Sequence, residues 1–292
     1  MRGIISITSE EKKALPFVLP GILISCLLIL YPLFYIIRLS FLDSSTAVTS
    51  FSGLSNYMRL MRNPQFTDAL STTAVWTLLT VTFSFLIGFA FALLINSKGI
   101  QFKGFWRSIL FVTWIMPGVV KATAWRWLFA AESGMVNHML QSANIISQPI
   151  PFLSSPQFAI YSVIVVQIWA CAPYVMLMMS AGLQMLSKEL YESADLDGAN
   201  LFQKTFNITL PLLKDISFIC VLMLFIWAIN EFALIWIMTS GGHDTTTLSL
   251  LVYNQFRVLN LNAASASAIM QLIVTMLFAL IYIRFVSREE RS

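Results

Sequence analysis

The chain has 292 residues, of which 58% are hydrophobic and only 11% are charged, and its formal net charge at pH 7 is +4. A soluble globular domain carries about 25% charged residues, so this composition excludes a cytosolic globular protein and favours a chain surrounded by lipid. The basic residues lie in short pieces between apolar stretches, which excludes the nucleic-acid-binding class that a pI near 9.0 would otherwise suggest.

Six apolar stretches follow one another along the chain, and each has the roughly 20 residues that a helix needs to cross a bilayer. They cover residues 16–41, 69–95, 105–130, 158–186, 216–239 and 264–286. Several contain proline, such as Pro32, Pro117 and Pro173, which membrane helices tolerate because neighbouring helices satisfy the freed backbone groups. The sequence predicts an all-α, polytopic membrane protein with six transmembrane helices in a single domain over residues 1–292.

The Lys and Arg residues give the predicted spans a direction, because these residues accumulate on the cytoplasmic side of a membrane. Twelve lie on one side of the spans and three on the other. The twelve are Arg2, Lys12, Lys13, Lys98, Lys103, Arg107, Lys188, Lys204, Lys214, Arg284, Arg288 and Arg291; the three are Arg59, Arg62 and Arg257. Both termini are therefore expected in the cytoplasm, as is the segment over 187–211.

That segment, between the fourth and fifth spans, has the pattern of two short helical pieces. Two apolar faces recur at helical spacing on either side of a bend at Gly198: Leu190, Tyr191 and Ala194, then Ala199, Phe202 and Phe206. An interfacial helix lying on lipid favours Lys and Arg on its polar face. Residues 192–211 of this segment instead carry Glu192, Asp195 and Asp197 against the single Lys204, which favours a protein partner over a lipid surface.

Glu231 lies inside the predicted fifth span, where a charge costs roughly 2.5–3.5 kcal/mol on insertion scales. Such residues face a bundle interior or a wet cavity, so Glu231 and Asn230 are candidates for lining a translocation path, with Trp227 one turn away. The alternative is structural pairing of Glu231 with Lys121 or Arg126 of the third span, and the sequence leaves both open.

Motifs for catalysis are absent from the sequence. It contains no G-x-x-x-x-G-K-[ST] loop for binding and hydrolysing ATP and no H-E-x-x-H metal motif. His138 and His243 lie in predicted external loops, and the three cysteines have no spacing suited to a metal site or a disulfide framework. We expect a protein that is not an enzyme and that binds no metal or cofactor itself.

The segment over 187–211 resembles the loop that marks the membrane subunits of bacterial ABC importers, in which E-A-A is followed after three residues by G. Here the chain reads Glu192-Ser193-Ala194 and then Asp197-Gly198-Ala199, and Pro211 closes the loop. Ser193 in place of the usual Ala is the one departure in the core of the motif, and both residues are small.

Nearly the whole chain resembles the carbohydrate-importer branch, of the maltose and glycerol-3-phosphate permease type. The supporting stretches are LPGILISCLLILYPLFYIIRLSF (19–41), FSGLSNYMRLM (51–61), FWRSILFVTWIMPGVV (105–120) and TSGGHDTTTLSLLVYNQF (239–256). His243 stands where the family usually has Pro, so that turn is expected to differ. The resemblance implies the fold of a type I ABC importer permease.

The resemblance also implies that the 187–211 loop is a coupling helix that docks on a cytoplasmic ATPase subunit. The residues it assigns to coupling are Glu192, Ser193, Ala194, Asp197, Gly198, Ala199, Phe202, Phe206 and Pro211. Of these, Glu192, Gly198 and Ala199 are expected in the contact itself. Phe202 and Phe206 are expected to anchor the loop to the permease's own helices.

Similar permeases carry polar residues toward the translocation cavity near Glu231 and Asn230, in agreement with the cost argument. Trp227, Trp169 and Tyr174 add aromatic faces against which sugar rings could pack, although aromatic stripes in membrane helices more often serve plain packing. The implied partners are a second permease, two ATPase subunits that bind ATP and Mg²⁺, and an external solute-binding protein at a bacterial inner membrane. The alternatives are a self-contained secondary transporter or channel, and a structural scaffold.

Overall fold

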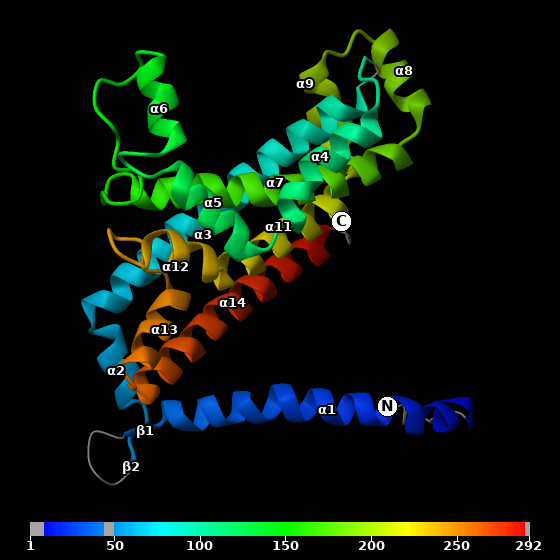
Figure 1. The fold of residues 1–292 in the computed structure, drawn as a ribbon. Coiled ribbons are helices and arrows are strands. Elements are labelled where there is room, and N and C mark those ends of the chain that lie inside the picture. The colour runs from blue at the N-terminus through cyan, green and yellow to red at the C-terminus, as the bar shows by residue number, and fades with distance from the viewer. Residues whose placement is uncertain (1–8, 44–49, 98, 290–292) are drawn as a thin grey trace. The chain divides into compact units, whose positions relative to one another are not determined.

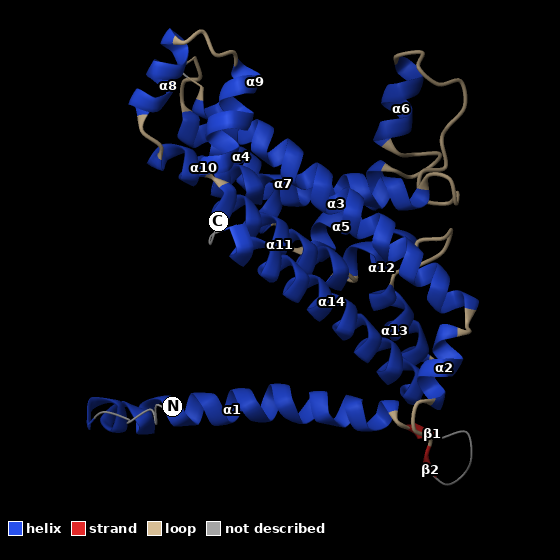
Figure 2. Ribbon diagram, turned by 180° about the vertical axis from the view of Figure 1, so that it is seen from behind, coloured by secondary structure: helices blue, strands red, loops and turns tan. Residues whose placement is uncertain are grey.

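The computed structural model describes residues 9–43, 50–97 and 99–289, which are helical over most of their length (Figures 1 and 2). Contacts divide the chain into two compact units, Met1–Arg62 with Val252–Met270 and Asn63–Leu251 with Gln271–Ser292. The single domain over 1–292 stays a prediction. Arg2, Lys98 and Arg291 of the charge comparison lie outside the described residues.

The first unit holds the long helix α1 (Ser9–Ser40), the paired strands β1 (Leu42–Asp43) and β2 (Ser50–Phe51), and α2 (Ser55–Met61). The strands are antiparallel, with Leu42 opposite Phe51. The unit also takes in the end of α13 (Leu248–Arg257) and the first part of α14 (Leu261–Glu289).

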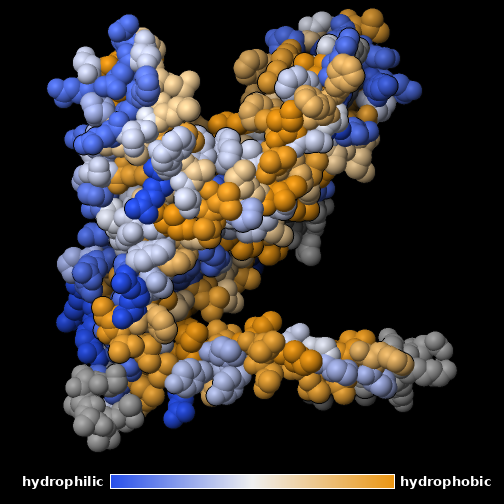
Figure 3. Space-filling model, viewed as in Figure 1, coloured by the Kyte–Doolittle hydropathy of each residue, from blue (hydrophilic) through white to orange (hydrophobic). Residues whose placement is uncertain are grey.

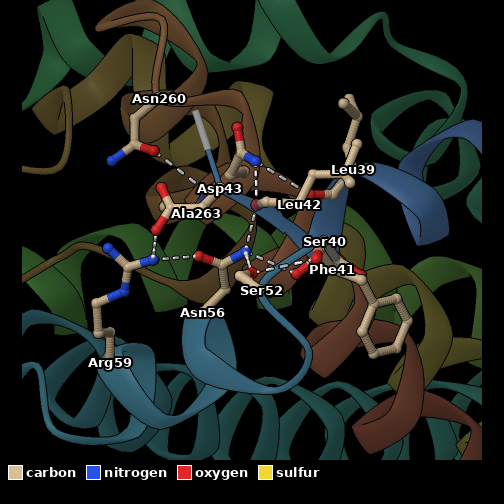
Figure 4. A network of polar contacts seen from close by, with 11 residues as sticks. Leu39, Ser40, Phe41, Leu42, Asp43, Ser52, Asn56, Arg59, Asn260 and Ala263 are labelled. Atoms are coloured by element: carbon tan, nitrogen blue, oxygen red, sulfur yellow. Dashed lines mark hydrogen bonds and ion pairs between the residues drawn. The ribbon is translucent and has the colours of Figure 1, made fainter. Parts of the chain in front are cut away.

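The C-terminal end of α1 is capped by side chains from α2 and α14. The last four carbonyl groups of any helix lack a partner inside it. Here all four are bound: Ile37 by Ser40 Oγ (2.6 Å), Arg38 by Phe41 N (3.2 Å), Leu39 by Asn262 Nδ2 (3.3 Å) and Ser40 by Asn56 Nδ2 (2.8 Å). Figure 4 shows Asn56 pointing at Ser40 and at the Leu42 carbonyl, with Arg59 bridging Asn56 and Asp43. The FSGLSNYMRLM stretch (51–61) therefore supplies, through Asn56, a cap for α1.

The second unit is built around α3 (Pro64–Asn96) and α7 (Ala159–Met185), which pack along their length. Asn63 caps α3, its Oδ1 accepting from Gln65 N at 2.9 Å, with Pro64 in the first turn. The core between α3, α7 and α11 (Lys214–Asn230) is apolar and includes Phe89, Ala92, Val175, Met176, Met179, Cys220 and Leu224. Gly88 lets the backbones of α3 and α7 approach, because a Cβ there would meet the Ala172 carbonyl oxygen.

The predicted third span, 105–130, consists of two helices. α4 (Lys103–Ile115) and α5 (Gly118–Leu128) meet at 94°. Pro117 lies at the bend, and the residue before a proline is pushed out of the helical region; Met116 accordingly has ψ 131°. Pro117 is therefore a break in this chain and not a tolerated kink.

The predicted fifth span, 216–239, is also interrupted. α11 ends at Asn230 and α12 (Ala233–Thr239) begins three residues later, with Glu231 and Phe232 outside both helices. The remaining described helix of this unit before α7 is α6 (Met135–Ser142), which stands in the loop between α5 and α7.

Within the part of the chain that the structure describes, four helices are long and apolar enough to cross a membrane: Pro16–Ser40, Pro64–Asn96, Ala159–Met185 and Leu261–Arg284. Two bent pairs, Lys103–Ile115 with Gly118–Leu128 and Leu201–Leu212 with Lys214–Asn230, bring the number to as many as six. The chain is a multi-pass membrane protein. Figure 3 shows hydrophobic side chains along α1, whereas hydrophilic side chains gather over α6 and over α8 (Lys188–Leu196).

Candidate functional site

Residues 187–212 form a helical hairpin, in which α8 leads to a turn and the chain returns through α9 (Leu201–Lys204), the π-helix η1 (Thr205–Thr209) and α10 (Leu210–Leu212). Ser187 caps α8, its hydroxyl accepting from Glu189 N at 3.2 Å. Asn200 and Gln203 form a reciprocal capping box at α9. The two predicted helical pieces are confirmed, but Ala199 lies in the turn and not on the second helix.

The turn of the helical hairpin depends on Gly198. This residue has φ +73°, in the left-handed region that glycine adopts without strain. Gly198 N donates to Asp195 O at 3.1 Å and Ala199 N donates to Ala194 O at 2.9 Å. These two bonds form the Schellman motif, which satisfies the last carbonyls of α8. The predicted bend at Asp197-Gly198 is therefore present, and it has a backbone cause.

The candidate coupling residues differ in exposure. Glu192, Ser193, Asp197, Gly198 and Pro211 are exposed, Ala199 is half-buried and Ala194 is buried. The exposed tip combines acidic and small residues, and Gly198 has no heavy atom within 4 Å of the place where a Cβ would lie. Another protein surface can therefore approach the backbone of this turn closely.

The expectation that Phe202 and Phe206 anchor the helical hairpin to the chain's own helices is not met. Phe202 is 75% exposed and Phe206 is 57% exposed. Their rings stack on each other with centroids 6.0 Å apart. The expectation fails because the apolar stripe of the second limb faces outward, so the two rings form an exposed apolar patch beside the polar tip.

Two of the candidate path residues come together in an aromatic cluster. The rings of Tyr174 on α7 and Trp227 on α11 meet edge to face, with centroids 4.7 Å apart. Trp114 on α4 completes the cluster, stacked on Tyr174 at 5.8 Å and tilted against Trp227 at 5.9 Å. All three side chains are half-buried. Sequence reasoning missed Trp114, because the contact joins three helices that are distant in the sequence.

Trp169 takes part in a different set of ring contacts. Its ring meets Trp125 of α5 edge to face at 5.4 Å, and Trp125 lies 5.2 Å from Phe129. Phe129 in turn packs on Phe152 at 5.0 Å. Trp169 and Tyr174 therefore lie on the same helix but belong to separate aromatic groups.

Glu231 and Asn230 lie at the break between α11 and α12. A Glu231 carboxylate oxygen accepts from Leu234 N at 2.9 Å, so it satisfies an early backbone donor of α12. Among the described residues, Glu231 makes no ion pair with Lys121 or Arg126; the Arg126 guanidinium instead donates to Ile237 O at 3.1 Å. The half-buried Glu231 is thus held by the backbone, and the structural-pairing alternative is not supported.

Side chains of three other helices bind the carbonyls that the break sets free. Trp76 Nε1 of α3 donates to Ala228 O at 2.9 Å. The Ile229 carbonyl accepts from Ser249 Oγ of α13 at 2.9 Å and from Gln271 Nε2 of α14 at 3.0 Å. The interruption of the fifth span is therefore a built feature, and it leaves Asn230 exposed beside the carboxylate.

A cavity of about 300 Å³ lies where α5 and α12 end, lined by Arg126, His243, Ser154, Phe129 and Phe152, among others. His243 has φ +55°, which proline cannot adopt because its ring holds φ near −65°. The turn over 240–244 therefore has a shape that the family's usual proline would not permit. Within the described residues, no three His, Cys, Asp or Glu side chains are grouped to hold a metal ion.

Comparison with known proteins gives consistent results. The family model described as "Binding-protein-dependent transport system inner membrane component" matches residues 84–291. The trehalose/maltose transport system permease protein MalF of Thermococcus litoralis is 27% identical over 94% of this chain and 94% of its own length. The sulfoquinovosyl glycerol transport system permease protein SmoG of Agrobacterium fabrum is 30% identical over 96% of this chain and 92% of its own.

A solved structure shares the fold. A chain of a bacterial alginate ABC transporter, crystallised with an alginate pentasaccharide-bound periplasmic protein, superimposes with a TM-score of 0.81 at 22% identity. The match covers 96% of each chain. At this level of identity the match establishes the fold and no more.

Proposed function

The chain belongs to the family of binding-protein-dependent transport system inner membrane components, and from this membership we infer that it is a permease subunit of an ATP-driven ABC importer. We propose that it crosses the bacterial inner membrane six times, with both termini in the cytoplasm. The four long apolar helices, the two bent pairs and the twelve-to-three distribution of Lys and Arg support this topology.

The helical hairpin couples the permease to a cytoplasmic ATPase. The observation that carries this proposal is its tip, where an exposed glycine in a Schellman turn stands between acidic residues and a pair of exposed phenylalanines. Exposed apolar side chains that lie together, as Phe202 and Phe206 do, mark a surface that a partner covers. The polar tip makes the partner a protein and not the anionic lipid surface.

The solute passes along the face of α4, α7 and α11. Trp114, Tyr174 and Trp227 are half-buried and offer ring faces, and the polar break at Asn230 and Glu231 lies at the end of the helix that carries Trp227. Aromatic faces with a few polar groups suit a sugar ring. The names of the relatives, which transport trehalose and maltose, lactose, or sulfoquinovosyl glycerol, point to a carbohydrate or sugar-like solute.

The chain forms half of the pathway and works with partners. A second, similar permease completes the path, two ATPase subunits bind ATP and Mg²⁺, and a solute-binding protein delivers the solute from outside. The chain itself carries no nucleotide-binding loop and is not an enzyme. The alternative, a self-contained secondary transporter or channel, rests on intramembrane acidic residues, and Glu231 is already engaged by a backbone amide.

Reconstitution tests the proposal. The chain is purified with its partner permease, ATPase and binding protein, placed in liposomes, and offered radiolabelled trehalose, lactose and sulfoquinovosyl glycerol with ATP on the ATPase side. We expect uptake of at least one solute that stops when ATP, the ATPase or the binding protein is left out. Uptake by this chain alone along an ion gradient would instead establish the secondary-transporter alternative.

A further inference from the structure

We propose that two side-chain pairs, Tyr191–Thr209 and Asp195–Lys204, lock the limbs of the helical hairpin into one rigid body, and that the π-helix η1 sets their register. The inference rests on the coupling role proposed above. It concerns positioning residues, which do not touch the ATPase but hold the contact surface in place.

The two pairs connect α8 to the returning limb like rungs. The Tyr191 hydroxyl lies 2.8 Å from Thr209 Oγ1, and the Lys204 ammonium is paired with the Asp195 carboxylate. The pairing is antiparallel, because the earlier residue of α8 meets the later residue of the other limb. The Gly198 turn lies beyond the Asp195–Lys204 pair, so the tip is supported from its base.

Thr209 connects the two side-chain pairs, because its hydroxyl contacts Tyr191 and also the backbone of Lys204. Its hydroxyl donates to the Lys204 carbonyl at 3.1 Å. Threonine has a single hydroxyl proton, so the proton in the 2.8 Å contact must come from Tyr191. The tyrosine, the threonine and the backbone of Lys204 therefore form a continuous chain that ends in the ion pair with Asp195.

The π-helix explains how Lys204 and Thr209 come to face α8 together. Tyr191 and Asp195 are four residues apart and share one face of an ordinary α-helix. Lys204 and Thr209 are five residues apart, and in an α-helix they would point roughly 140° away from each other. In a π-helix the hydrogen bonds close after five residues, which brings residue i+5 over residue i. One extra residue in the turn thus aligns both side chains with their partners.

Burial differs between the two pairs. Thr209 is 2% exposed, so water competes poorly for the Tyr191–Thr209 bond. The Lys204 side chain is 18% exposed but the Asp195 side chain is 53% exposed, so the ion pair is partly open to water and salt. Ala194, between Tyr191 and Asp195 on α8, is 8% exposed and packs the limbs together at this level. A push on the exposed tip is therefore passed to α10 and α11 and not absorbed by sliding of the limbs.

The test uses the complete reconstituted transporter and measures radiolabelled solute taken up per ATP hydrolysed, with whichever solute of the panel supports uptake. The variants are Tyr191→Phe and Thr209→Val, each of which removes one hydroxyl and keeps the shape of the side chain. The matched control is Tyr161→Phe, because the Tyr161 side chain is exposed and forms no hydrogen bond with any described residue.

We expect Tyr191→Phe to lower the coupling ratio about fivefold, the factor that corresponds to one lost hydrogen bond, and Thr209→Val to lower it at least as much, because it also removes the bond to the Lys204 carbonyl. The control is expected to leave the ratio unchanged. Co-purification of the ATPase is expected to stay normal, because the contact surface itself is intact. The double variant is expected to lose no more than Thr209→Val alone, since that variant already breaks the Tyr191–Thr209 bond together with the bond from Thr209 to the Lys204 carbonyl.

Coupling ratios for both variants equal to that of Tyr161→Phe would overturn the inference, as would fully additive losses in the double variant. If Thr209→Val does not assemble, Tyr191→Phe decides, because its ring stays in place. A Gly198→Leu variant separates the two levels of the argument. Normal coupling with Gly198→Leu overturns the coupling role, whereas uncoupling by Gly198→Leu with unaffected rung variants overturns the rungs alone.

Discussion

Gly198 combines a left-handed backbone with open space around it, so the cost of replacing it is conformational and not steric. An alanine at φ +73° costs about 1–2 kcal/mol, whereas asparagine visits this region more readily. The backbone conformation of the turn therefore favours glycine at this position even without a bound partner. The sequence motif and the fold place the same requirement on this position for separate reasons.

The first prediction compares Gly198→Ala with Gly198→Asn. Amide hydrogen exchange over residues 188–204 is expected to speed up about fivefold or more in the alanine variant, through the strained turn, and to change less in the asparagine variant. Mass-spectrometric exchange on the purified complex measures both. Equal protection in the alanine variant and the original chain would mean that the turn does not limit opening of the helical hairpin.

Single residues also mark the limit of reasoning from sequence. The exposed acidic tip was predictable because its residues are neighbours in the chain. The outward orientation of Phe202 and Phe206 was not, since the same periodic stripe fits an inward or an outward face. The meeting of Trp114 with Tyr174 and Trp227 depends on three helices and leaves no local signal of the contact.

At the scale of the helices, the close pairing of α3 with α7 depends on Gly88. A Cβ at this position would lie 2.6 Å from the Cβ of Val175 and would also meet the Ala172 carbonyl oxygen. Neither the Ala172 carbonyl oxygen nor the Val175 Cβ can move without moving the backbone of α7. Small residues at such contacts are what allow membrane helices to approach each other.

The second prediction is that Gly88→Ala destabilises the protein by about 1–3 kcal/mol, the usual cost of overpacking. Thermal unfolding in detergent, followed by tryptophan fluorescence, is expected to show a lower midpoint. Gly104→Ala is the control, because nothing lies within 4 Å of its Cβ position and it sits in the first turn of α4. Equal midpoints for the two variants would show that α7 yields at this contact.

The long helices were predictable from sequence, and the broken ones were not. The predicted first, second, fourth and sixth spans agree with the four long apolar helices within five residues at every end. The third and fifth predicted spans are also apolar but divide at Pro117 and at Glu231. Whether a membrane helix continues or breaks depends on the neighbours that bind the freed backbone groups, such as Trp76 and Gln271 at the second break, and these are distant in the sequence.

For the whole molecule, the proposed topology places the helical hairpin and α6 on opposite sides of the membrane. The third prediction uses a chain in which Cys26, the one exposed cysteine among the described residues, is replaced by Ser. Ser193→Cys in the hairpin is expected to react with a membrane-impermeant maleimide only from the cytoplasmic side. Gln141→Cys in α6 is expected to react only from outside; both positions are exposed.

Inside-out and right-side-out vesicles supply the two orientations. Labelling of both cysteines from the same side would contradict the six-span arrangement, and so would labelling of Ser193→Cys from outside. The sequence predicts sidedness from a sum of charges and not from any one contact, and the labelling experiment tests that prediction.

The capping of the C-terminal ends of α1 and α11 has a consequence for biogenesis. Asn262 binds the Leu39 carbonyl at the end of α1, and Ser249 and Gln271 bind the Ile229 carbonyl at the end of α11. All three side chains are synthesised after the helices whose ends they cap. Until the last helix has been inserted, the Leu39 carbonyl lacks Asn262 and the Ile229 carbonyl has Ser249 but lacks Gln271. A nascent chain stopped before residue 260 would therefore hold every earlier span and still be immature, a substrate for membrane proteases and not a transporter.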